Sequence, residues 1–133
     1  MVAAVADTHA ALWHLYGDAR LSARARDFIE SSARVGQKVG VSTISLAEIV
    51  YLAEKQRIPA TAFEDLSEAV ADPDGVFQEI PLTQRIVCSM AVVIRQEVPD
   101  LPDRIVAATA LQLGVPVISR DSRIRASSVQ TVW

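Results

Sequence analysis

The sequence predicts an α/β domain in which helices flank a mostly parallel sheet of four to five strands. Two observations support this class. Short, strongly apolar runs recur along the chain, and segments with the apolar spacing of a helix separate them. The 133 residues contain no repeat and no linker-like stretch, so we expect one domain over residues 1–133.

The first half of the chain alternates two strands with four helices. The apolar run 2–6 predicts a strand that ends at Asp7, where a helix to about residue 15 begins. Ser22 suits the N-cap of a second helix that ends near residue 34. A strand at 39–41 follows between two glycines. Helices are then expected at 43–56, which Pro59 closes, and at 61–70.

The second half opens with an Asp-Pro-Asp-Gly turn at 72–75 and a strand at 76–80. Apolar residues at helical spacing predict a helix over 83–95. Pro102 suits the first turn of the next helix, and Gly114 suits its C-terminal end. The run 115–119 is the most apolar, so a central strand is expected there, followed by a short helix and an edge strand at 129–132.

Composition narrows the kinds of function. No apolar run approaches the roughly 18 residues of a membrane span, so we expect no membrane contact. A single cysteine, Cys88, fits a reducing cytoplasm, and its apolar neighbours predict a buried side chain. Proteins that bind nucleic acid through their overall charge are usually basic. The formal net charge of −3 therefore argues against such binding, unless metal ions neutralise some of the acids.

Four acidic residues stand where the expected elements meet: Asp7, Glu48, Asp103 and Asp121. Asp7 and Asp121 each follow a strand, and residues just past the carboxyl ends of parallel strands converge on one crevice. Carboxylates gathered there repel one another, and their hard oxygen atoms suit Mg²⁺ or Mn²⁺. Proteins hydrolyse phosphodiesters at such sites. The sequence therefore suggests a metal-dependent phosphodiesterase.

Each acid also has an ordinary structural explanation. Three of them stand at helix starts, where a carboxylate caps the helix or gains from its dipole. Glu48 lies three residues after Ser45, the spacing of a capping box, although Ser42 is the competing N-cap. If the acids only cap helices, the domain is a binding or regulatory module without catalysis.

Other chemistries lack their motifs. The chain has no glycine-rich phosphate loop and no Gly-x-Ser-x-Gly elbow. His9 and His14 have no partner at zinc spacing, and packing or surface roles are expected for them, although His9 could line the crevice. A phosphoryl-accepting receiver domain would need paired acids near the first strand, where Asp7 stands alone.

Four segments, in order along the chain, resemble the motifs of PIN-domain ribonucleases: Val5-Ala-Asp-Thr-His-Ala-Ala-Leu-Trp13, Val41-Ser-Thr-Ile-Ser-Leu-Ala-Glu-Ile49, Pro102-Asp-Arg-Ile-Val-Ala-Ala-Thr-Ala110 and Val117-Ile-Ser-Arg-Asp121. The resemblance spans nearly the whole chain. The size and the Asp-Thr-His-Ala opening are most similar to VapC-type toxins of type II toxin–antitoxin pairs. The resemblance implies a PIN-like three-layer α/β/α sandwich and an endoribonuclease that depends on Mg²⁺ or Mn²⁺.

The same resemblance implies roles for the acids. Asp7 and Asp103 would be the closest metal ligands. Glu48 and Asp121 would bind through water, complete a second metal site or position the nucleophile. The reaction implied is in-line attack by a metal-activated water on the RNA phosphodiester.

Supporting residues follow from the resemblance as well. Thr8 and Ser119 match hydroxyl positions that support the acids, with Ser119 where the family usually has threonine. Arg104 matches a residue that steadies the site or touches phosphate. Contacts to the RNA backbone are expected from arginines near the crevice mouth: Arg24, Arg120 and Arg123.

The implied partners are an RNA substrate, a cognate antitoxin that masks the site, and a second copy of the chain in a homodimer. Two alternatives stay open at this point. One is a catalytically inactive PIN-like binding module, and the other is a PIN nuclease of RNA maturation.

Overall fold

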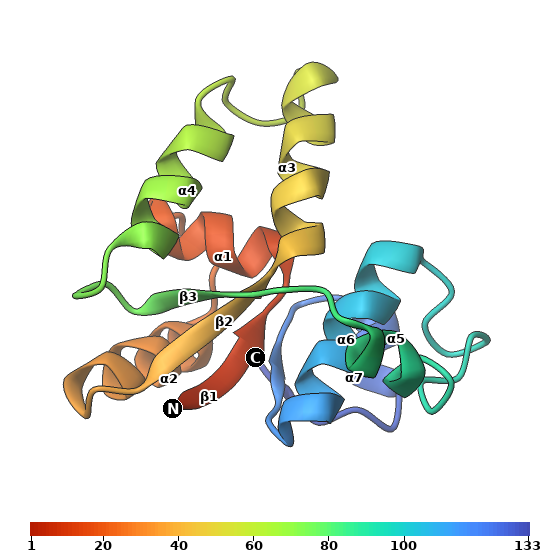
Figure 1. Ribbon diagram of the computed structural model, residues 1–133. Helices are drawn as coiled ribbons and strands as arrows, with labels where there is room; N and C mark the ends of the chain where they lie inside the picture. The colour runs from red at the N-terminus through yellow and green to blue at the C-terminus, as the bar shows by residue number, and fades with distance from the viewer.

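The computed structural model describes every residue from Met1 to Trp133 (Figure 1). Five parallel strands form one sheet in the order β3-β2-β1-β4-β5. The strands are β1 (Val2–Ala6), β2 (Lys38–Ser42), β3 (Phe77–Ile80), β4 (Val117–Ile118) and β5 (Thr131–Val132). The helices are α1 (Thr8–Leu15), α2 (Ala23–Arg34), α3 (Thr43–Glu54), α4 (Ala62–Ala71), α5 (Gln84–Ser89), α6 (Leu101–Leu113) and α7 (Ser122–Ala126).

Helices cover both faces of the sheet, as the three-layer prediction requires. Side chains alternate between the faces along each strand. Ala4, Ala6 and Ile118 join one core cluster with residues of α1 to α4, whereas Val5 and Val117 join a second cluster with residues of α5 to α7. In Figure 1, α3 and α4 extend beyond the sheet as a helical pair. None of the helices has the length and apolar character needed to span a membrane.

The strand order places a switch point between β1 and β4. From β1 the chain moves through α1 and α2 to β2 on one side, whereas β4 pairs with the other side of β1. In an open parallel sheet, the crevice at the carboxyl ends of two such strands is the usual ligand site. Asp7 directly follows β1, and Asp121 follows β4 by three residues. The topology therefore brings these two acids to the same crevice.

Three differences from the sequence-based expectations have physical causes. The helix expected over 83–95 ends at Ser89, because the chain turns there to bury Val93 and Val98 in the second core cluster. The Cys88 side chain lies on the outward side of this short helix and is exposed, not buried. The central strand is β1, and β4 lies between β1 and the edge strand β5.

Candidate active site

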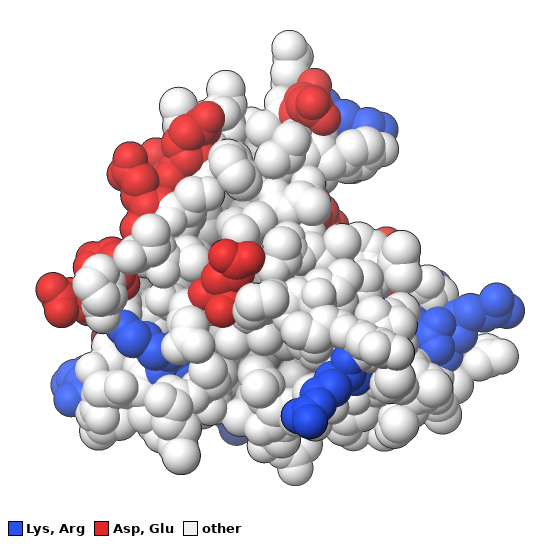
Figure 2. Space-filling model, viewed as in Figure 1, with Lys and Arg blue, Asp and Glu red and all other residues white.

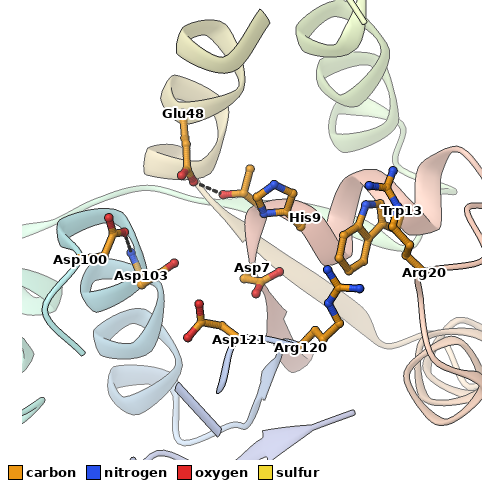
Figure 3. A pocket seen from close by; sticks show the side chains of 10 residues that line it. Asp7, His9, Trp13, Arg20, Glu48, Asp100, Asp103, Arg120 and Asp121 are labelled. Atoms are coloured by element: carbon orange, nitrogen blue, oxygen red, sulfur yellow. Dashed lines mark hydrogen bonds between the residues drawn. The ribbon is translucent and has the colours of Figure 1, made fainter. Parts of the chain in front are cut away.

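The four predicted acids line a single open pocket at the carboxyl end of the sheet (Figure 3). A fifth acid, Asp100, joins them there. The remaining lining residues are Thr8, His9, Trp13, Arg20 and Arg120. Segments that lie far apart in the sequence, from α1, α3, α6 and the β4–α7 connection, therefore meet at one place.

Asp7 is both a helix cap and a pocket residue. Its Oδ1 atom accepts a hydrogen bond of 2.8 Å from the Ala10 backbone N–H, which caps α1. The residue is only 8% exposed. Burial raises the pKa of Asp7, while hydrogen bonds from Ser119 and the Ala10 N–H partly offset this rise. The cap uses one of the two carboxylate oxygen atoms.

Asp121 repeats this arrangement at the start of α7. Its Oδ1 atom accepts from the backbone N–H groups of Arg123 and Ile124, at 2.9 and 3.1 Å. The Asp121 N–H in turn donates to the buried Ser119 hydroxyl at 3.0 Å. Since Ser119 also forms a side-chain hydrogen bond with Asp7, it links the two acids that flank the switch point. This is the supporting position predicted for the hydroxyl.

Asp103 lies in the first turn of α6, which Asp100 caps by accepting from the Asp103 N–H at 3.1 Å. Burial raises the pKa of Asp103 to about 7, and the charges of Asp100, Asp121, Asp7 and Glu48 add to the rise. Negative charge is therefore concentrated around this carboxyl group. A divalent cation would relieve that repulsion.

Glu48 reaches the pocket from α3. The helix is capped by Ser42, whose hydroxyl accepts from the Ile44 N–H, so the alternative capping box at Ser45 is not formed. Glu48 Oε1 instead accepts a hydrogen bond of 2.5 Å from the Thr8 hydroxyl, 40 residues away in the chain (Figure 3). Thr8 thus holds Glu48 over the pocket, a supporting position like that predicted for it.

The predicted arginines separate into two groups. Arg120 lines the pocket, whereas Arg24 and Arg123 are exposed and do not. Arg123 contributes its backbone N–H to the Asp121 cap instead. The Arg104 guanidinium donates to the carbonyl groups of Val93 and Met90, at 3.1 and 2.9 Å, so it fixes the segment after α5 and does not line the pocket.

Sequence reasoning gave little weight to several residues at the pocket. His9 is exposed at its margin, and Trp13 stands four residues later on the same face of α1. This spacing, directly after Asp7, is the signal that could have identified Trp13. Arg20 pairs with Asp18 at 2.7 Å, and nothing local in the sequence places that pair beside the acids.

The donor chemistry of the pocket fits a hard divalent cation. Carboxylate oxygen atoms are the ligands that Mg²⁺ and Mn²⁺ prefer. No group of three or more His, Cys, Asp or Glu side chains is placed so that it could hold a metal ion together. The fit therefore lies in the kind of donor, since five carboxylates line the pocket.

The PIN domain family matches residues 4–128, which include the five pocket acids. The chain belongs to the PIN-domain family. The three-layer fold is thus that of a PIN domain.

Individual relatives agree with this assignment. The PIN domain is 29% identical to Ribonuclease VapC22 of Mycobacterium tuberculosis over 142 residues, and the alignment covers 100% of both chains. Among solved structures, a toxin–antitoxin complex from Klebsiella pneumoniae matches with a TM-score of 0.64 at 25% identity, covering 98% of this chain and 97% of that one. The VapBC2 complex of Rickettsia felis bound to a promoter DNA fragment shares the fold, with a TM-score of 0.70, 13% identity and the same coverage.

Proposed function

We propose that this PIN domain is a metal-dependent endoribonuclease and acts as the toxin of a type II toxin–antitoxin pair. The observation that carries the proposal is the convergence of Asp7, Glu48, Asp103 and Asp121 on one pocket in a PIN fold. The similarity to a ribonuclease of the VapC type supports the reaction, and the similarity to a toxin–antitoxin complex supports the biological role.

The four acids have different proposed roles in such a site. Asp7 and Asp103 are the proposed direct ligands of Mg²⁺ or Mn²⁺, and Glu48 and Asp121 hold water or a second ion. The cation, when bound, supplies a water of lowered pKa and neutralises charge on the phosphoryl oxygen atoms. The Thr8 hydroxyl orients the Glu48 carboxylate, and the Ser119 hydroxyl accepts from the Asp121 backbone N–H at the start of α7.

The protein has a net negative charge, so contact with RNA depends on individual basic side chains close to the pocket. On the face seen in Figure 2, acidic side chains gather over α4, and the basic ones are scattered at the lower left, the bottom, the right and near the top. Within the pocket, Arg120 has no carboxylate partner, since the chain has a single ion pair, between Arg20 and Asp18. Arg120 is therefore the proposed contact to the RNA backbone, with Arg24 and Arg123 outside the pocket.

The partners follow from the same proposal. A cognate antitoxin would mask the acidic pocket, for which a basic side chain of that partner is the complementary group. A homodimer in the cytoplasm is the proposed state of the free toxin.

Expression in a bacterial host tests the proposal. The wild-type protein should arrest growth and cleave RNA, and Asp103→Asn, which keeps the size of the side chain, should do neither. Asp27→Asn is the matched control, because Asp27 is an exposed acid on α2 outside the pocket. Equal growth arrest by the wild type and by Asp103→Asn would contradict a catalytic role for the pocket.

A further inference from the structure

A second hollow adjoins the acidic pocket. His9, Trp13 and Arg20 line both, so these three residues form a shared wall. The second hollow continues past this wall to the connection between α3 and α4, which contributes Arg57, Ile58 and Pro59. A chain-like ligand that lies in the first hollow can therefore continue into the second without leaving the surface.

Two guanidinium groups lie against Trp13 of the shared wall. The Trp13 ring lies between two guanidinium groups, with Arg20 Cζ at 5.1 Å and Arg120 Cζ at 4.6 Å from the ring centroid (Figure 3). Asp18 holds Arg20 in place through hydrogen bonds of 2.7 and 3.1 Å. Guanidinium groups bind phosphate and stack on bases, and Arg120, unlike Arg20, is not engaged by a carboxylate.

The second hollow has the chemistry of a nucleotide subsite. Leu12 and Ile58 give it an apolar lining, and Tyr16 adds an aromatic ring. Arg57 supplies a positive charge that no carboxylate of the chain neutralises. A base needs an apolar or aromatic surface, and its phosphate needs a cation, so the hollow offers both.

We infer that single-stranded RNA passes Arg120 in the acidic pocket and crosses the shared wall of His9, Trp13 and Arg20, and that a nucleotide flanking the cleaved phosphate binds in the second hollow beside Arg57. The inference rests on the proposed ribonuclease function. RNA is favoured as the occupant because the hollow is continuous with the acidic pocket and carries unpaired positive charge. Arg57 is then a specificity and affinity residue that does not touch the reacting atoms.

Binding of a fluorescein-labelled octaribonucleotide of random sequence tests this subsite. The parent protein carries Asp103→Asn, so that the RNA stays intact in Mg²⁺. Adding Arg57→Ala should weaken binding by about tenfold and reduce the slope of log K against log salt concentration by about 0.7, the value for one lost phosphate contact. Arg57→Lys should keep most of the slope.

Arg34→Ala is the matched control. Arg34 is an exposed arginine at the end of α2, shortly before β2 begins, and it lines neither hollow. This variant removes the same charge and should change affinity by less than about twofold. Equal effects of the two alanine variants would overturn the subsite. Unchanged RNA binding by Arg57→Ala, together with lost inhibition by a co-expressed antitoxin, would instead assign the hollow to the protein partner. Absence of both growth arrest and RNA cleavage by the wild-type protein would overturn the proposed function itself.

Discussion

The Thr8 hydroxyl donates a hydrogen bond of 2.5 Å to Glu48 Oε1 and so ties the start of α1 to the middle of α3. Thr8 is buried and directly follows Asp7. One backbone segment therefore provides a candidate metal ligand and orients another. Such a link makes the positions of the acids depend on each other.

Thr8→Val should lower RNA cleavage by on the order of tenfold, since residues that orient metal ligands have effects of that size. Valine keeps the shape of the side chain and removes only the hydroxyl. Thr8→Ser, which keeps the hydroxyl, should stay within about threefold of the wild type. Cleavage rates for a labelled RNA give the comparison, and equal losses in the two variants would show that the hydrogen bond is not the cause.

Two substitutions of Asp7 should distinguish its role in stability from its role in catalysis. Asparagine caps a helix about as well as aspartate, so Asp7→Asn should be more stable than Asp7→Ala by about 1 kcal/mol. Both variants should lose cleavage, because neither has the carboxylate. Urea denaturation measures the free energy of unfolding. A cleavage-competent Asp7→Asn variant would leave the residue with only its capping role.

The pKa of Asp103 predicts how stability depends on pH in the absence of metal. The folded protein holds this proton up to about pH 7, whereas the pKa of an unfolded aspartate is 3.8. The folded state therefore binds more protons in that window, and stability falls as the pH rises through it. In EDTA, the wild type should lose more thermal stability between pH 5 and pH 8 than Asp103→Asn does. Identical pH profiles would show that burial and the neighbouring acids do not raise the pKa of Asp103.

Arg104 should matter for the segment after α5. Its guanidinium satisfies the carbonyl groups of Met90 and Val93, so Arg104→Ala should destabilise the fold by about 1–3 kcal/mol. Arg95→Ala, in the same segment but exposed, should change stability by less than about 0.5 kcal/mol. Urea denaturation compares the free energies of unfolding of the two variants. An Arg104→Ala variant as stable as the wild type would show that these two hydrogen bonds do not stabilise the segment.

Much of the fold could be predicted because local signals agree with the tertiary structure. The apolar runs at β1 and β4 are followed by Asp7 and Asp121, and parallel strands bring their carboxyl ends to one edge. The capping interpretation and the site interpretation apply to the same residues, because Asp7 and Asp121 cap helices and also line the pocket. Oδ1 of each residue caps a helix, and Oδ2 does not take part in that cap.

Other features depend on contacts that no local pattern encodes. The Trp13 ring meets Arg20 and Arg120 only after the sheet has formed, because Arg120 comes from the segment after β4. The helix expected to reach residue 95 stops at Ser89, where burial of Val93 and capture of the Met90 carbonyl by Arg104 outweigh the helical spacing of the apolar residues. In both cases tertiary packing decides what the local sequence leaves open.

Calorimetric titration of Mn²⁺ into the purified protein tests the central claim most directly, because it needs no knowledge of the RNA. At pH 7.5, the wild type should show saturable binding with release of protons, and Asp103→Asn should show at least about a tenfold loss of affinity. The exposed-acid variant Asp27→Asn should bind as the wild type does. Indistinguishable binding curves for the wild type and Asp103→Asn would contradict a metal-dependent site at these four acids.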